Sequence, residues 1–256
     1  MNEKTLTGLA TYDFQGASVL VTGGTSGIGA ATAFAFRDAG AEVIIAGTRP
    51  SLSDYDQSFT GFGYRQCDVT DSAQVDALAN GIDQLDVLVH SAGIGLAAIG
   101  LDESIPDNFE LAVRMHLTSV YRLTYGCLDK LANSKLAAGG SVIGIASMSS
   151  FFGVPVVPGY GAAKGGLVQL MKTMATTWSD KGIRANAIAA GMIKTRQTKG
   201  AIDNEEFAGY MLARTPMKRF GEASEIADAA LFLSSSRASY ITGQTVSVCG
   251  GFSIAG

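Results

Sequence analysis

The sequence is poor in the residues on which several classes of protein depend. Among 256 residues there are two histidines, five prolines, one tryptophan and three cysteines. The cysteines, Cys67, Cys127 and Cys249, are odd in number and far apart in apolar segments. This pattern argues against a disulfide framework and against a zinc site, and it predicts reduced core thiols and no bound metal. Two histidines and the absence of a Gly-x-Ser-x-Gly turn also make a Ser-His-Asp hydrolase a poor alternative.

Long apolar runs are missing as well. No uncharged apolar stretch reaches the ~18 residues that a membrane span needs, and residues 1–13 lack the apolar centre of a signal peptide. We therefore expect a cytoplasmic protein with no membrane partner and a loose N-terminal arm over residues 1–13. A net charge of −4 gives no reason to expect nucleic acid as a partner. No linker or charge block interrupts residues 14–256, which predicts a single domain there.

Glycine, by contrast, is abundant, with 32 residues, and three spaced glycines among those that follow the apolar run ending at Thr22 form a pattern. They stand at positions 23, 27 and 29, directly before an amphipathic segment at 28–39, which is the order strand, tight turn, helix. Gly23 allows the turn, Gly27 lets backbone approach a phosphate, and Gly29 allows helix and strand to pack closely. Because free N–H groups at a helix start bind pyrophosphate, the segment predicts nucleotide binding; a purely structural turn is the alternative.

The rest of the chain alternates short apolar runs with amphipathic segments. The runs predict strands at 43–46, 64–67, 85–89, 142–146, 185–189 and 245–248, and the segments between them predict helices at 72–82, 106–130, 160–181 and 222–235. Asp71 or Ser72 is expected to cap the first of these helices. Together these elements predict an α/β, Rossmann-like, doubly wound fold, with a seven-stranded parallel sheet and helices on both faces. Ligands bind beyond the carboxyl ends of the strands in such folds.

Two side chains of the predicted helix at 160–181 indicate acid–base chemistry. Tyr160 and Lys164 are one helical turn apart, so they share a face, and a nearby ammonium is expected to lower the pKa of the phenol towards the working range. Ser147, at the end of the strand before, is placed to hold a substrate carbonyl.

The glycine spacing and the set Ser147, Tyr160, Lys164 resemble those of the short-chain dehydrogenase/reductase family, and the likeness runs along nearly the whole chain. Single-domain members similar to 3-oxoacyl-carrier-protein reductases resemble it most. The resemblance implies that Tyr160 is the general acid or base, that Ser147 orients the substrate, and that Lys164 binds the nicotinamide ribose and tunes Tyr160.

The second strand is followed by Gly47, Thr48 and Arg49, with no acid before Asp54. An acidic residue there selects a ribose 2′-hydroxyl, whereas Arg49 is suited to a 2′-phosphate, so NADP(H) is favoured and NAD(H) stays open. The alternative is that Arg49 is a solvated turn residue. Ser26 stands where related NADP-users often have a basic residue.

By resemblance, further residues contact the cofactor. Asp68 and Val69 would meet the adenine, and Ile193 and Thr195 the nicotinamide carboxamide. Ser91, Ala92 and Gly93 match a family segment in which His90 and Ser91 replace two asparagines; His90 is interpreted as a packed strand-end residue. The expected cofactor-binding set is Gly23, Thr25, Ser26, Ile28, Gly47, Thr48, Arg49, Asp68, Val69, Ser91, Ala92, Gly93, Tyr160, Lys164, Ile193 and Thr195.

His116 stands where the family usually has an asparagine that holds a water linked to the catalytic lysine. An imidazole in that relay would titrate near its ordinary pKa of ~6.5, so we count His116 among the catalytic candidates; a buried histidine that only fills space is the alternative. Cys249 replaces a usual aspartate, and no role follows from that change.

The substrate side is expected from residues 196–220, a helical lid, and from an apolar wall of Phe151, Phe152, Val156, Val157 and Met192. The alternative is that these aromatics pack the lid or a subunit contact. The resemblance implies a homotetramer, with a dimer as the alternative. The predicted function is an NAD(P)-dependent oxidoreductase, of carbonyl-reductase type, that interconverts a ketone or aldehyde and an alcohol. An NADP-binding regulatory protein with silent chemistry is the second hypothesis.

Overall fold

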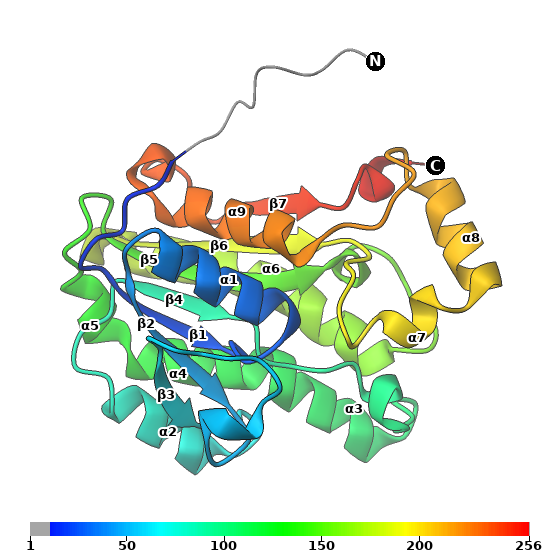
Figure 1. Ribbon diagram of the computed structural model, residues 1–256, viewed down its shortest axis with the longest axis horizontal. Helices are drawn as coiled ribbons and strands as arrows, with labels where there is room; N and C mark the ends of the chain where they lie inside the picture. Colours follow the sequence, from blue (N-terminus) through cyan, green and yellow to red (C-terminus); the bar gives the residue numbers. More distant parts are fainter. Residues whose placement is uncertain (1–10, 256) are drawn as a thin grey trace.

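Seven parallel strands form one sheet in the order β3-β2-β1-β4-β5-β6-β7 in the computed structural model of the protein, which describes residues 11–255 (Figure 1). The predicted sheet and fold class are thereby confirmed. Each strand lies on or beside a predicted apolar run. The strands are β1 (Ser18–Thr22), β2 (Glu42–Gly47), β3 (Gly63–Gln66), β4 (Val87–His90), β5 (Gly140–Ser147), β6 (Ile183–Ala190) and β7 (Thr245–Val248).

Helices cover both faces of the sheet. On one face α1 and α9 lie side by side, α1 against β1 and β2 and α9 against β5, β6 and β7, and on the other face α2, α4 and α6 pack against the same sheet (Figure 1). This is the doubly wound arrangement that alternation of strands and helices predicts. The helices are α1 (Gly27–Asp38), α2 (Ser72–Asn80), α3 (Pro106–Val113), α4 (Ser119–Gly126), α5 (Leu128–Ala132), α6 (Pro158–Trp178), α7 (Lys199–Ile202), α8 (Glu205–Arg214) and α9 (Ala223–Ser234).

The helix expected at 106–130 is not continuous, which corrects the sequence-based prediction. A π turn at Arg114–Thr118 joins α3 to α4, and Cys127 separates α4 from α5. Apolar periodicity does not reveal such a turn, because it adds one residue without removing helical character. The expected cap at Asp71 is confirmed, since its carboxylate accepts hydrogen bonds from the N–H groups of Ala73 and Gln74.

Asp86 lies at the edge of the sheet where the strands begin, opposite to their carboxyl ends, and its hydrogen bonds stabilise that edge. Its side chain is fully buried just before β4. Oδ2 accepts a hydrogen bond from the Ser18 N–H at 2.8 Å, and Oδ1 accepts bonds from the Ser134 hydroxyl at 2.7 Å and the Lys135 N–H at 2.6 Å. One carboxylate thus ties the start of β1 to the segment that leads into β5, and these donors lower its pKa.

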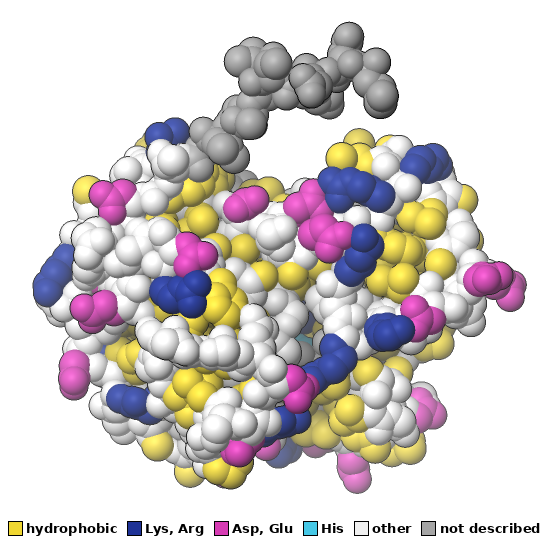
Figure 2. Space-filling model, viewed as in Figure 1, with side chains coloured by type: hydrophobic (Ala, Val, Ile, Leu, Met, Phe, Trp, Pro, Cys, Tyr) yellow, Lys and Arg dark blue, Asp and Glu magenta, His cyan; other side chains and the backbone are white. Residues whose placement is uncertain are grey.

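The predicted N-terminal arm, residues 1–13, lies for the most part outside the described residues. Over residues 11–255, no helix has both the length and the apolar character that crossing a bilayer requires. Within the same range no cluster of three or more potential metal ligands is present. Acidic and basic side chains are interspersed on the face that Figure 2 shows, so no large patch of one charge forms there. Cys67 and Cys127 are buried as expected, whereas Cys249 is only partly buried.

Candidate active site

The glycine-rich turn has the geometry that its three glycines were expected to allow. Gly23 and Gly27 adopt positive φ angles of 67° and 53°. A Cβ at Gly29 would lie 2.2 Å from the Gly23 carbonyl oxygen, and one at Gly23 would lie 2.7 Å from Cα of Ala92. No side chain fits at either place, so helix α1 comes close to β1 and to the residues that follow β4.

The N-terminus of α1 is suited to an anionic group. Ser26 is the N-cap residue but makes no capping hydrogen bond with its side chain, and the first turn contains no acid. The leading N–H groups are therefore not satisfied by a side-chain cap, and the helix dipole adds positive potential. Thr195, from the segment after β6, lies next to this turn, because a Cβ at Gly27 would be 3.3 Å from its methyl group. The residues present thus fit a pyrophosphate, as expected from the sequence.

At the end of β2, Arg49 is held by aromatic residues that sequence reasoning missed. The guanidinium carbon of Arg49 lies 4.9 Å from the ring centroid of Tyr55. The backbone N–H of Arg49 donates a hydrogen bond to the Tyr55 hydroxyl at 2.9 Å. The Tyr64 hydroxyl donates to the carbonyl of Gly47 at 3.1 Å. A Cβ at Gly47 would lie 2.5 Å from the Tyr55 oxygen and 2.8 Å from Cγ2 of Thr25, so Gly47, Thr25 and Tyr55 form one tight group.

Ser147, Tyr160 and Lys164 meet at the carboxyl end of β5. Ser147 is the last residue of β5, and its hydroxyl accepts a hydrogen bond from the Ser149 N–H at 3.2 Å. Tyr160 and Lys164 lie in the first turns of α6, with the Lys164 ammonium 5.5 Å from the Tyr160 ring centroid. Lys164 is buried and donates to the Ile145 carbonyl at 2.6 Å. The three side chains that the sequence singled out are therefore neighbours.

The electrostatics of this group differ from the sequence-based expectation. The pKa of Tyr160 is raised above 10.0, chiefly because burial disfavours the phenolate; a hydrogen bond with Ser147 acts in the opposite direction, and the charge of Glu103 adds to the rise. Burial lowers the pKa of Lys164 to about 8. The pKa of Tyr160 thus departs from its ordinary value in the direction opposite to that expected, while the Lys164 ammonium, 5.5 Å from the ring centroid, donates to the Ile145 carbonyl.

His116 lies within the π turn and against Tyr160. The two rings are edge-to-face, with centroids 4.8 Å apart. Nε2 of His116 lies 3.1 Å from the Ile94 carbonyl, which can only accept, so Nε2 bears the proton. Nδ1 is then a buried acceptor with no partner among the described residues. The ring also covers Gly93, whose φ is 141° and where a Cβ would lie 2.2 Å from Cε1 of His116. A line of contacts thus runs from Gly23 through Ala92, Gly93 and His116 to Tyr160.

His116 does not ionise near pH ~6.5 as expected, because its surroundings shift its pKa. Burial, together with the charge of Lys164, lowers the pKa of His116 from 6.5 to about 3, although the Ile94 carbonyl acts in the opposite direction. We therefore expect that wild-type protein and His116→Asn have pH–rate profiles of the same shape between pH ~5 and ~8, because the imidazole stays neutral throughout. A limb near pH ~6.5 in wild-type protein that is lost in His116→Asn would contradict this.

The other residues near the carboxyl ends of the strands lie as follows. His90 is buried, and its Nε2 lies 2.8 Å from Oγ1 of Thr124, so the interpretation as a packed residue is confirmed. Asp68 accepts hydrogen bonds from the N–H and hydroxyl of Thr70 at 2.9 and 2.7 Å. Val69 packs on the core, Ile28 is partly buried, and Ser91 donates its N–H to the Thr22 carbonyl at 3.2 Å.

The segment after β6 positions Ile193 and Thr195 beside the glycine turn. Ile193 is buried and forms an isolated parallel bridge with Gly221. The Thr195 hydroxyl lies 3.1 Å from that of Thr198, which closes a tight turn before α7. Helices α7 (Lys199–Ile202) and α8 (Glu205–Arg214) lie within residues 196–220, so the segment is partly helical as predicted.

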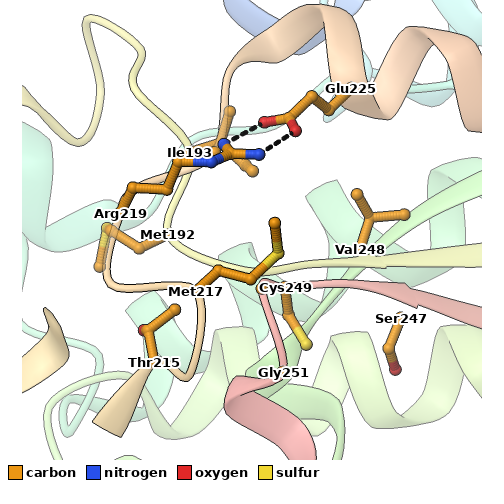
Figure 3. A pocket seen from close by; sticks show the side chains of 12 residues that line it. Met192, Ile193, Thr215, Met217, Arg219, Glu225, Ser247, Val248, Cys249 and Gly251 are labelled. Atoms are coloured by element: carbon orange, nitrogen blue, oxygen red, sulfur yellow. Dashed lines mark hydrogen bonds and ion pairs between the residues drawn. The ribbon is translucent and has the colours of Figure 1, made fainter. Parts of the chain in front are cut away.

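The expected apolar wall is not one surface. Phe151 and Val156 are exposed, whereas Phe152 packs edge-to-face on Phe252 with centroids 6.1 Å apart. Met192 lines a different pocket of about 330 Å³, between the end of β7 and residues 215–221 (Figure 3). In that pocket the Arg219 guanidinium pairs with Glu225 at 2.6 Å. Neither Ser147, Tyr160 nor Lys164 lines it.

Known proteins are similar to this chain over most of its length. The model of the family described as enoyl-(acyl carrier protein) reductase matches residues 23–253. The chain is 35% identical over 246 residues to the 3-oxoacyl-[acyl-carrier-protein] reductase FabG of Salmonella typhimurium, covering 93% of this chain and 98% of that protein. It is 32% identical over 253 residues to the gluconate 5-dehydrogenase of Gluconobacter oxydans, covering 95% and 97%. Among solved structures, a gluconate 5-dehydrogenase from Burkholderia cenocepacia in complex with NADP and tartrate superimposes with a TM-score of 0.84 at 27% identity, covering 96% of this chain and 98% of that one.

Proposed function

The chain belongs to the short-chain dehydrogenase/reductase family, and from this premise we propose that it is an NAD(P)-dependent oxidoreductase in which Tyr160 gives or takes the proton of the reacting oxygen. The reaction interconverts a carbonyl and an alcohol. The observation that carries the assignment is the meeting of Ser147, Tyr160 and Lys164 at the carboxyl end of β5, beside the residues that follow β4.

Each residue has a task that its position supports. The bound nicotinamide supplies or accepts the hydride. Ser147 holds the substrate oxygen near the phenol, because its hydroxyl lies at the end of β5 and close enough to Tyr160 to affect the pKa of the phenol. Tyr160, protonated in this environment, is ready to act as an acid when a carbonyl is reduced and must lose its proton for the reverse reaction. The N–H groups that begin α1 bind the pyrophosphate, and α7 and α8 form the lid.

NADP(H) is the favoured cofactor, with Arg49 as the residue that recognises the 2′-phosphate. Support comes from the lack of an acid at the end of β2 and from the stacking of Arg49 on Tyr55, which limits the rotamers of the guanidinium before a ligand binds. Thr25 and Thr48 supply nearby hydroxyl groups.

Arg49→Ala is expected to narrow the preference for NADPH over NADH by roughly tenfold, because the loss of one charge-assisted contact costs about 1.4 kcal/mol. The measurement is kcat/KM with each cofactor for the variant and for wild-type protein. Arg37→Ala is a matched control, because Arg37 lies in the last turn of α1 and is paired with Asp38. A wild-type kcat/KM that is higher with NADH would overturn the assignment.

The substrate class is a small ketone or aldehyde and the corresponding alcohol. The substrate class is tested by measuring turnover of a panel of 3-ketoacyl thioesters, keto-sugar acids and simple ketones. If none of these compounds is turned over, the alternative is favoured, a regulatory protein that binds NADP without catalysing a reaction. A homotetramer or a dimer, located in the cytoplasm, is our further proposal; light scattering on the purified protein measures the assembly.

A further inference from the structure

Glu103 lies before α3 and is almost fully buried, with 2% of its surface exposed. Its Oε2 accepts a hydrogen bond from the backbone N–H of Tyr160 at 2.7 Å, and its Oε1 accepts one from the N–H of Leu96 at 3.4 Å. Sequence reasoning gave this residue no role, because the segment between β4 and α3 has no recognisable pattern.

A carboxylate in such a place is costly unless something stabilises its charge. Among the residues that the structure describes, no Lys or Arg forms an ion pair with Glu103. Its compensation comes from α6, a helix of 21 residues that begins at Pro158 and whose third residue is Tyr160. The positive end of that helix and its free N–H groups stabilise an acceptor there. Glu103 therefore caps, from another part of the chain, the helix that carries the proposed acid–base residue.

We propose that Glu103 is a positioning residue of the reaction: its carboxylate fixes the backbone of Tyr160 and disfavours the phenolate form of that side chain. This rests on the proposed role of Tyr160. The charged and titratable groups around the phenol are few. Lys164 comes from α6 itself and His116 from the π turn, while Ser147 of β5 is a neutral hydrogen-bonding partner.

Glu103 is the group among these that brings a negative charge. His116 is neutral at ordinary pH because its pKa is about 3, and the Lys164 ammonium is turned towards the Ile145 carbonyl. The Glu103 carboxylate, which is bonded to the backbone N–H of the same residue, adds to the rise in the pKa of the Tyr160 phenol, because like charges repel. Glu103 and burial therefore both favour the protonated phenol, the form that reduction of a carbonyl uses.

The second contact of Glu103 links the cofactor side to the catalytic side. Leu96 lies three residues after Gly93, in the segment that leaves β4 past the glycine turn. One carboxylate thus joins this segment to the first turn of α6. The two hydrogen bonds of Glu103 are thus a direct physical connection between this segment and the backbone of Tyr160.

The test uses Glu103→Gln, which keeps an acceptor oxygen for the Tyr160 N–H and removes the charge. We expect the pH–rate limb that depends on Tyr160 to move to lower pH by about one unit, for carbonyl reduction and for alcohol oxidation alike. The phenol itself is titrated by the ultraviolet absorbance of tyrosinate, taken as the difference between each protein and the same protein with Tyr160→Phe. The pH at the midpoint of this difference titration should fall by the same amount. Glu110→Gln is the matched control, because Glu110 is exposed on α3 and its charge is screened by water.

Glu103→Asp separates position from charge, since aspartate keeps the charge but is one methylene too short to reach the Tyr160 N–H. We expect Glu103→Asp to lower kcat at least fivefold with little change in KM. The pH–rate limb that depends on Tyr160 should lie closer to that of wild-type protein in Glu103→Asp than in Glu103→Gln. The proposal is overturned if the limb and the tyrosinate difference of Glu103→Gln match those of wild-type protein. Near-normal turnover of Tyr160→Phe would instead overturn the proposed function, so the two failures are distinguishable.

Discussion

Replacement of Tyr160 by phenylalanine is expected to lower turnover by at least ~10²-fold while cofactor affinity stays within a few-fold, because the change removes a positioned acid–base group and little else. The ring keeps its edge-to-face contact with His116, and the N–H that Glu103 binds belongs to the backbone. The fold and the nucleotide site should therefore survive. Steady-state turnover with a reactive ketone and cofactor binding by fluorescence are the two measurements.

Tyr125→Phe is the matched control for that experiment. Tyr125 lies on α4 and is 63% exposed, so Tyr125→Phe also removes a phenolic hydroxyl, but one on the surface and not that of Tyr160. The control should have wild-type turnover. Tyr160→Phe with near-normal turnover would show that another group moves the proton.

Asp86→Asn should lower the free energy of unfolding by about 3 kcal/mol, the scale of losing charge-assisted hydrogen bonds in a buried site. Both carboxylate oxygens accept from N–H or O–H donors, including those of Ser18 and Lys135. An amide would turn its NH₂ group towards one of these donors and leave it unsatisfied. Urea denaturation measures the difference, with Asp83→Asn, an exposed neighbour, as the control. A loss no larger than that of the control would contradict the role of Asp86.

The same residue predicts how stability depends on pH. The donors around Asp86 hold its pKa below the ordinary value even though burial acts in the opposite direction. A depressed pKa in the folded state means that the stabilisation is complete above the unfolded value of ~3.9 and is lost as pH falls through the folded value. The stability difference between wild-type protein and Asp86→Asn should thus be constant near neutral pH and shrink only in acid below pH ~4.

The parts of the fold and the site that sequence reasoning recovered are those set by local chemistry. Strands such as β2 and β4 are short apolar runs, and a buried parallel strand has few other ways to appear in a sequence. The glycines at 23, 27 and 29 were informative because a Cβ would collide with backbone at two of them and the third has a positive φ. Tyr160 and Lys164 were informative because one helical turn separates them.

What sequence reasoning missed depends on contacts between distant parts of the chain. Glu103 and Tyr160 are 57 residues apart, and nothing near Glu103 indicates that its carboxylate ends at the start of α6. The pKa of His116 was misjudged for the same reason, since the burial and the Lys164 charge that depress it come from packing. Tyr55 escaped notice because aromatic residues in a turn are ordinarily just packing, whereas here the ring lies under Arg49.

The π turn at Arg114–Thr118 has a consequence for the number of residues in this part of the chain. A π turn holds one residue more than the regular turn that it replaces, so it behaves as a one-residue insertion confined to a single point of a helix. The helices before and after it, α3 and α4, both bury side chains, Ala112 in α3 and Val120 and Leu123 in α4. The added residue lets the backbone bulge where His116 is directed at Tyr160 and Gly93. A shorter chain could keep the same helices, but it would have to present a different side chain to the phenol. The length of the chain at this one turn and the identity of the group beside Tyr160 are thus linked.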